Sequence, residues 1–189
     1  VFLGLGTLRL LFMYVLMVRE KRAENRRHYP PIDPATAPLV SIIVPAYNEE
    51  VNIVRTIKTL KQQDYPNIHI YFVDDGSKDH TLERVREAFG DDREVTILSK
   101  PNGGKASALN YGVEACISEY VVCIDADTQL KNDAVSRLMK HFIADKEQRV
   151  GAVAGNVKVG NQRNMLTYWQ AIEYTSSQNF DRMAYSNIN

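Results

Sequence analysis

The sequence predicts an α/β domain with a mainly parallel sheet. From residue 39 onward, short apolar runs rich in β-branched residues alternate with amphipathic segments, as strands connected by crossover helices do. Four of the apolar runs end in clusters of Asn, Asp, Gly or Lys. The chain has 189 residues, 44% of them apolar and 24% charged, so it is long and apolar enough to bury the core of about one domain.

Residues 1–18 are predicted to form a transmembrane helix. The segment is apolar except for Thr7 and Arg9, and its length is near the lower limit of about 20 residues that a bilayer requires. Five basic residues follow: Arg19, Lys21, Arg22, Arg26 and Arg27. Positive charge flanks membrane helices on the cytoplasmic side. We therefore expect a lipid bilayer as partner, at the cell (plasma or inner) membrane, with the remaining chain cytoplasmic. An amphipathic helix at the membrane surface is the alternative.

Residues 19–38 are predicted to be a basic flank and a proline-rich linker. Four of the seven prolines lie between His28 and Pro38, and such a composition favours an extended chain. The domain itself is expected to cover residues 39–189. Since the chain begins with Val1 rather than Met, we expect it to be part of a longer protein.

Hydrophobic periodicity places the elements of this domain in order. The predicted strands are the apolar runs Val40–Val44, Ile68–Val73, Val95–Leu98, Tyr120–Ile124 and Gly151–Val159. The predicted helices have apolar residues at three-to-four spacing: Glu50–Gln63, Asp79–Phe89, Lys105–Cys116, Asn132–Ile143 and Asn164–Tyr185. Asp79 and Asn132 are the predicted N-caps of two of these helices.

Composition excludes several classes of function. The 23 basic and 23 acidic residues cancel, so no nucleic-acid partner is expected. Cys116 and Cys123 are too few for a disulfide framework or a cysteine zinc site, and the four histidines lack the spacing of a histidine metal motif. The chemistry is therefore expected from the polar clusters, because ligands bind outside the carboxyl ends of parallel strands.

Asp125 and Asp127 form the most informative cluster. They follow an apolar run directly, and residues two apart in an extended segment point the same way. Two like charges at that spacing repel each other unless a cation or several donors lie between them. Mg²⁺ or Mn²⁺, held by one or two carboxylates and completed by substrate phosphates, suits this pair.

The other three clusters carry complementary groups. Asp74 and Asp75 follow a strand, and one of them is expected to accept from a ligand NH or hydroxyl while the other supports the loop. Lys105 follows two glycines at a helix start, where backbone NH groups favour an anion; a simple glycine cap is the alternative. Tyr47 is expected to stack on a base, and Glu49 to cap the next helix or accept from the base.

Together these motifs closely resemble family 2 glycosyltransferases. The resemblance rests on VSIIVPAYNEE, VDDGSKD, KPNGGKASALN and VVCIDADTQL, in that order, and covers about residues 39–159. The apolar N-terminal segment and VAGNVKVGNQRN are most similar to membrane synthases of β-linked polysaccharides, such as chitin-oligosaccharide, poly-N-acetylglucosamine, hyaluronan and cellulose synthases.

This resemblance implies an A-type glycosyltransferase nucleotide-sugar-binding fold preceded by a transmembrane helix. It implies an inverting enzyme that takes a UDP-sugar, with UDP-N-acetylglucosamine favoured by likeness, and transfers the sugar to a growing glycan acceptor. Membrane synthase subunits are implied as further partners. The donor-binding residues that it implies are Tyr47, Glu49, Asp74, Asp75, Lys105 and Asp125, and the ligands of Mg²⁺ or Mn²⁺ are Asp125 and Asp127.

Two motifs of the resembled synthases have no match in this chain. An acidic motif ending in Glu-Asp supplies their general base, and a Gln-x-x-Arg-Trp motif holds the acceptor. The base is therefore expected beyond Asn189, and the chain alone is expected to be inactive. One alternative is a nucleotidyltransferase, although its phosphate loop would replace PAYNEE after the first strand. The other is a non-catalytic nucleotide-binding module of a membrane synthase.

Overall fold

The computed structural model describes residues 2–156 and 165–175 of the chain. The chain divides into two compact units. One comprises residues 30–150 and is called the sheet unit below; the other comprises residues 1–29 and 151–189. Every residue predicted to bind the donor or the metal lies in the sheet unit.

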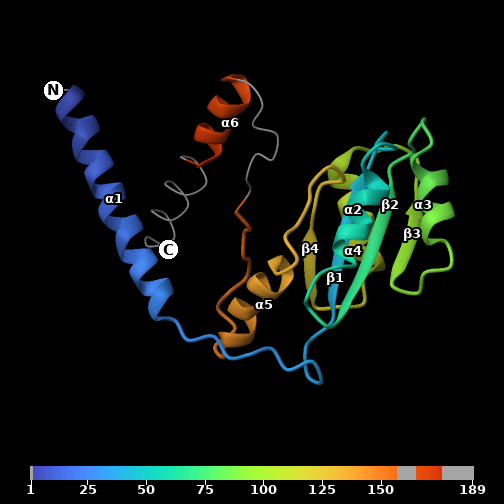
Figure 1. Cartoon of the computed structure of the whole chain (residues 1–189), viewed down its shortest axis with the longest axis horizontal. Helices are drawn as coiled ribbons and strands as arrows, with labels where there is room; N and C mark the ends of the chain where they lie inside the picture. The colour runs from blue at the N-terminus through green and yellow to red at the C-terminus, as the bar shows by residue number, and fades with distance from the viewer. Residues whose placement is uncertain (1, 157–164, 176–189) are drawn as a thin grey trace. The chain divides into compact units, whose positions relative to one another are not determined.

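Four parallel strands form the sheet (Figure 1). They are β1 (Val40–Ala46), β2 (Ile68–Asp74), β3 (Val95–Ser99) and β4 (Tyr120–Cys123), in the spatial order β3-β2-β1-β4. The chain moves outward from β1 to β3 and then returns to place β4 on the other side of β1. The strand order therefore reverses between β1 and β4, and this is the place in an open α/β sheet where ligands bind.

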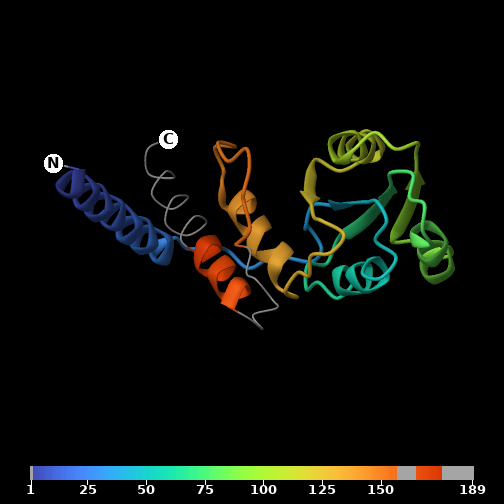
Figure 2. The same cartoon turned by 90° about the horizontal axis from the view of Figure 1, so that it is seen from above.

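Helices cover both faces of the sheet, as Figure 2 shows. α2 (Ile53–Leu60) and α3 (Thr81–Phe89) lie on one face, and α4 (Lys105–Ala115) lies on the other. Side chains alternate along a strand, so Ile42 packs into the core on the side of α2 while Ile43 packs on the side of α4. Burial on both faces explains why β1 is almost continuously apolar.

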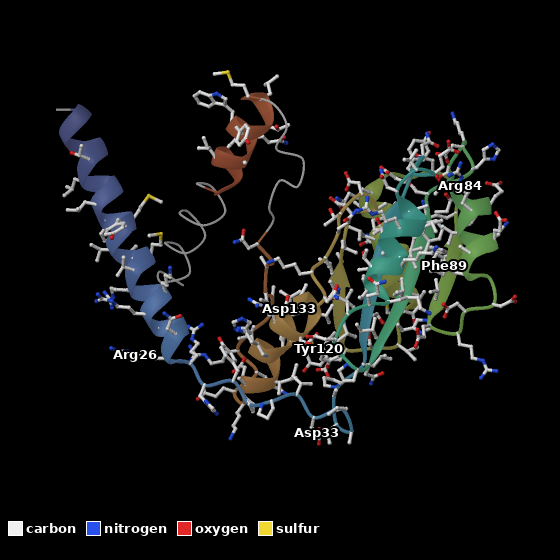
Figure 3. All side chains as sticks on the ribbon, viewed as in Figure 1. Arg26, Asp33, Arg84, Phe89, Tyr120 and Asp133 are labelled. Carbon is white, nitrogen blue, oxygen red and sulfur yellow. The ribbon has the colours of Figure 1, made fainter. Side chains whose placement is uncertain are left out.

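α5 (Ala134–Ala144) contributes to the same core as α2 and α3. Val135 and Met139 on α5 are buried within it. The ring of Phe142 meets Tyr120 at the start of β4 edge to face, with centroids 5.4 Å apart. Figure 3 labels Tyr120 at this position.

The structure confirms the parallel α/β architecture and the four strands that precede residue 125. α2, α3 and α5 begin two or three residues later than predicted, because the residues before them form loops. α4 begins at Lys105 as predicted. The residues at the N-cap positions of α3 and α5 are His80 and Asp133, each one residue after the predicted Asp79 and Asn132, although Asp79 still accepts from the first N–H of α3.

The predicted strand over residues 151–159 is also wrong in its described part. Residues 151–156 have no regular structure, and residues 157–159 lie outside the described residues. A strand requires a hydrogen-bonded neighbour, and within the described chain none of the four strands pairs with this segment.

The second unit contains two described helices, α1 (Phe2–Arg26) and α6 (Met165–Thr175). α1 continues past the predicted end at Val18 through most of the basic flank, and the rest of the helix predicted over residues 164–185 lies outside the described residues. In the part of the chain that the structure describes, no helix has both the length and the apolar character needed to cross a membrane. The transmembrane segment is therefore not confirmed, and the cytoplasmic location stays a prediction.

Gly112 allows α4 to approach the sheet closely. A Cβ atom at this position would lie 2.6 Å from Cγ2 of Ile43 and 3.2 Å from Cγ2 of Val73. Both of these side chains are fully buried in the core between α4 and the sheet. A methyl group at position 112 would therefore push α4 away from the strands that carry the site.

We expect the substitution Gly112→Ala to lower the free energy of unfolding by about 1–3 kcal/mol, since overpacking a filled core costs about this much. Helix propensity alone would predict the opposite sign, because alanine stabilises a helix by about 1 kcal/mol relative to glycine. Urea unfolding followed by circular dichroism measures the change. Gly151→Ala is the control, because a Cβ there meets no atom within 4 Å. A Gly112→Ala variant as stable as the parent would contradict the close approach.

Candidate active site

The end of the sheet between β1 and β4 is open. The pairing of β4 with β1 ends at Cys123 opposite Ile43, and the Ile124 N–H donates to the Ile43 carbonyl at 3.1 Å. β1 continues to Ala46, so its last residues have no neighbour on the β4 side. Because backbone direction alternates, the nitrogen of Pro45 faces this side, and a proline leaves no unpaired N–H there.

A pocket of about 470 Å³ lies at this opening, within the size range of small-molecule sites. Residues that follow all four strands line it. Six of the seven residues predicted to bind the donor or the metal are among them: Tyr47, Glu49, Asp75, Lys105, Asp125 and Asp127. The structure therefore brings these side chains together, while their individual roles stay predictions.

The seventh residue, Asp74, is buried and does not line the pocket. Its carboxylate accepts hydrogen bonds from the Ser77 N–H at 3.3 Å and from the Ser99 hydroxyl at 3.2 Å. Sequence alone left open which aspartate of the pair faces a ligand. The structure places Asp75 at the pocket and Asp74 among loop contacts.

The Asp75 carboxylate is held by three donors. Its Oδ1 accepts from Lys100 Nζ at 2.6 Å and from the Gly103 N–H at 3.0 Å, and its Oδ2 accepts from the Gly104 N–H at 2.7 Å. Burial by itself would raise the pKa of Asp75, but the bonds from Lys100 and the two amides outweigh burial and lower it. Asp75 is therefore a buried carboxylate that stays ionised at neutral pH.

The same contacts correct the expectation for the start of α4. The sequence predicted that the backbone NH groups of Gly103 and Gly104 would bind an anionic ligand, but they donate to Asp75 instead. The anion that a helix start favours is supplied here by the protein itself. Gly104 has a φ of 84°, a conformation that glycine adopts without strain.

Lys105 remains at the pocket, where it forms an ion pair with Asp125. The two side chains are 61% and 54% exposed, and an ion pair this exposed contributes at most about 1 kcal/mol. Asp127 is exposed, and its carboxylate has a weak contact with the Thr128 hydroxyl at 3.4 Å. A ligand can therefore take over Lys105, Asp125 and Asp127 at little energetic cost.

The charge of the pocket favours a cation. Four carboxylates line it, from Glu49, Asp75, Asp125 and Asp127, and ion pairs with Lys100 and Lys105 balance two of them, Asp75 and Asp125. In the described part of the chain, no group of three or more His, Cys, Asp or Glu side chains is placed to hold a metal. Asp125 and Asp127 both line the pocket, and two carboxylates are a donor set that fits a divalent cation whose remaining ligands are water and a phosphate group.

Two loops beside the pocket are joined through Asn48. This residue has a φ of 56°, in the left-handed region that asparagine tolerates better than most residues. Its N–H donates to the Ser77 hydroxyl at 3.0 Å, and its Oδ1 accepts from the Lys78 N–H at 2.8 Å. The segment that carries Tyr47 and Glu49 is thus fixed to the loop after β2.

Asp79 extends this junction between the two loops. Its carboxylate accepts from the Glu50 N–H at 3.2 Å and from the Thr81 N–H at 3.0 Å, and the Thr81 hydroxyl accepts from the Glu49 N–H at 2.8 Å. Arg84, labelled on α3 in Figure 3, donates to the Glu50 carbonyl at 3.1 Å. Sequence analysis missed this function of Asp79 because it read the residue as a local helix cap.

Lys100 and Asn102 are also new to the site. Asn102 lines the pocket, and Lys100 lies behind Asp75. Both belong to the KPNGGK motif, in which the sequence predicted a function only for the two glycines and Lys105. A basic residue just after a predicted strand was the available signal for Lys100.

Comparison with known proteins agrees with this arrangement. The model of the family described as "Glycosyl transferase family 2" matches residues 41–187. The poly-beta-1,6-N-acetyl-D-glucosamine synthase of Staphylococcus epidermidis is 35% identical over 138 residues, which are 72% of this chain and 33% of that protein. The hyaluronan synthase of Pasteurella multocida is 38% identical over 133 residues, which are 69% of this chain and 14% of that protein. The chain thus spans about a third or less of the length of these relatives.

A solved structure with a similar fold is the mannosyltransferase PcManGT of Pyrobaculum calidifontis in complex with GDP-Man and Mn²⁺. The TM-score is 0.61 at 28% sequence identity, and the match covers 76% of this chain and 43% of that one. The parallel sheet described above is therefore of the kind found in nucleotide-sugar-dependent glycosyltransferases.

We expect the substitution Asp79→Asn to lower the free energy of unfolding at pH 7 by about 1–3 kcal/mol, the range for hydrogen bonds to a charged group. Burial would raise the pKa of Asp79, but the bonds from Thr81 and Glu50 lower it below 3.8. A lowered pKa gives stability that is present above the unfolded value and is lost as the pH falls through the folded value.

The difference in stability between the parent and Asp79→Asn should therefore stay constant from pH 7 to about 5 and shrink as the pH falls further toward the lowered pKa of Asp79. Urea titrations at several pH values measure it. Asp91→Asn, at an exposed acid of the same unit, is the control and should show no such trend. A difference that stays constant with pH would show that the charge of Asp79 does not join the loops.

Proposed function

The chain belongs to glycosyl transferase family 2, and from this we propose that the sheet unit binds the nucleotide-sugar donor of a polysaccharide-forming glycosyltransferase. The observation that carries the proposal is the pocket at the reversal of strand order, where Lys105, Asp125 and Asp127 meet. An exposed lysine beside two exposed carboxylates suits a diphosphate with a divalent cation better than it suits a neutral ligand.

The donor in this proposal is a UDP-sugar, and UDP-N-acetylglucosamine is the first candidate. Two observations support it: the motifs of the pocket, and the names of relatives that are N-acetylglucosamine polymer and hyaluronan synthases. Tyr47 is 42% exposed at the pocket, so its ring is available to stack on the base. Lys105 would exchange Asp125 for an oxygen of the diphosphate.

Asp125 and Asp127 would hold Mg²⁺ or Mn²⁺ in this proposal. The mannosyltransferase of similar fold was solved with Mn²⁺, which supports a divalent cation of this kind. When bound, such a cation offsets the negative charge that develops on a departing nucleoside diphosphate. The protein's own contribution is to place both exposed carboxylates at the pocket, with Asp125 paired to Lys105.

The sugar would pass to the end of a growing β-linked glycan with inversion at the anomeric carbon. We place the general base for the acceptor hydroxyl outside this pocket. Asp75 is bound by three donors, Asp125 and Asp127 are assigned to the cation, and Glu49 is assigned to the nucleoside base of the donor. The proposal therefore separates donor binding, which belongs to the sheet unit, from the step that activates the acceptor.

The substitution Asp127→Asn tests the metal assignment. We expect the Mn²⁺-dependent affinity for UDP to fall at least about 10-fold, because one of two charged ligands is lost. Unfolding should be unchanged, since Asp127 is exposed and its described side-chain contact is weak. Isothermal titration calorimetry with and without Mn²⁺ measures the affinity. Glu83→Gln, an exposed acid on α3, is the matched control. Equal Mn²⁺-dependent affinity in both variants would remove Asp127 from the site.

The purified 189-residue chain should bind UDP with Mn²⁺ but transfer no sugar. A positioned base accelerates a reaction about 10²- to 10⁴-fold, and orientation of the acceptor adds a further factor. We expect neither contribution from this chain alone. Incubation with radiolabelled UDP-N-acetylglucosamine and a chitin oligosaccharide, followed by chromatography of the products, tests this. Labelled oligosaccharide above the level of a boiled control would mean that the base lies within the chain.

A further inference from the structure

Lys100 contacts the site without lining it. It follows β3 directly, and its side chain is 15% exposed. Its ammonium group donates to Asp75 Oδ1 at 2.6 Å and to the Pro101 carbonyl at 2.7 Å. Asp75 lines the pocket and Lys100 does not, so the ion pair with Asp75 is the charged contact through which Lys100 can act on a ligand.

The contacts of Asp75 can be counted against its capacity. An ionised carboxylate has about four acceptor positions, two on each oxygen. Oδ1 receives Lys100 Nζ and the Gly103 N–H, and Oδ2 receives the Gly104 N–H. Within the described part of the chain, these donors leave one acceptor position, and it is on Oδ2. Lys100 thus determines which oxygen of Asp75 can serve a ligand.

The ion pair with Lys100 also favours the ionised form of Asp75 although other carboxylates lie nearby. The charged groups that line the pocket with Asp75 are Glu49 from the loop after β1, Lys105 from α4, and Asp125 and Asp127 from the loop after β4. Asp74 precedes it in the chain, and three of the lining groups are carboxylates. Loss of Lys100 would remove one of the contacts that lower the pKa of Asp75 and would leave only the two amide bonds to oppose burial and these neighbours. A protonated Asp75 would present a donor where the ligand requires an acceptor.

We propose that Lys100 is a positioning residue for nucleotide binding: its ion pair holds Asp75 as an ionised acceptor with one free position, which takes an N–H or O–H group of the nucleoside. The inference rests on the proposed function, since it requires a nucleotide in the pocket. It adds a residue that does not touch the ligand and was given no role by the sequence.

The test compares UDP affinity at two pH values. Calorimetry with UDP and Mn²⁺ at pH 8 and pH 5.5 is applied to the parent, Lys100→Met, Lys100→Arg and the control Lys61→Met. Lys61 also forms ion pairs, with Asp92 and Glu94, but it does not line the pocket or contact Asp75. Affinities are expressed relative to the parent at the same pH, so that protonation of UDP itself cancels.

We expect Lys100→Met to bind within about 5-fold of the parent at pH 8 and to lose at least about 3-fold more affinity at pH 5.5, because Asp75 takes up a proton more readily without the ammonium group. Lys100→Arg keeps the charge and should stay within about 3-fold of the parent at both values, as should Lys61→Met. A loss by Lys100→Met that is equal at both pH values would indicate a purely structural role and overturn the proposal.

Two further outcomes keep the test decisive. If circular dichroism shows that Lys100→Met does not fold, Asp75→Asn at pH 8 replaces it, because an amide mimics the protonated acid in size. Binding of UDP by Asp75→Asn at the level of the parent would overturn the proposal. If the parent itself binds no UDP, the proposed function fails and this inference fails with it. If the parent binds UDP but the affinity lost in Lys100→Met does not depend on pH, only this inference is overturned.

Discussion

The geometry of the pocket depends on the hydrogen bonds that the Asp75 carboxylate accepts. Asp75 follows β2, and its partners lie at the end of β3 and at the start of α4, so a single buried anion fixes two adjacent connections. Gly76 beside it has a φ of 71°, and a Cβ there would lie 2.7 Å from the Asn102 nitrogen. Removing Lys100 or Asp75 would leave an unpaired buried charge, which costs more than the loss of an exposed ion pair.

The site thus contains two kinds of charge. Asp75 is buried and bound by three donors, so it holds loops in place, and a ligand can add a bond to its remaining acceptor position without displacing these donors. Lys105, Asp125 and Asp127 are exposed and weakly engaged, so they can change partners when a ligand arrives. The buried carboxylate of Asp75 fixes the loops before a ligand binds, and the exposed groups of Lys105, Asp125 and Asp127 stay available to that ligand. The pocket is therefore preorganised without being blocked.

Much of this arrangement could be predicted from the sequence. Strand positions follow from apolar runs such as Val40–Val44, and parallel strands bring their carboxyl ends to one edge, which gathers Tyr47 and Asp125 without knowledge of side-chain contacts. The functions of Lys100 and Asp79 could not be predicted in this way. Their partners are 25 and 29 residues away in the chain, and no local period records such a pairing. The failed strand over residues 151–156 has the same cause, since an apolar run alone does not specify a neighbour.

The central position of β1 has a consequence for how the domain folds. Val40 pairs with Ile68 on one side and with Tyr120 on the other, so the second pairing closes a much longer stretch of chain than the first. Contacts distant in sequence slow folding, because chain entropy is lost before they form. During synthesis, β1, β2 and β3 can associate while β4 is still inside the ribosome. The pocket between β1 and β4 is therefore completed late, and until then one edge of the most apolar strand is exposed to other chains.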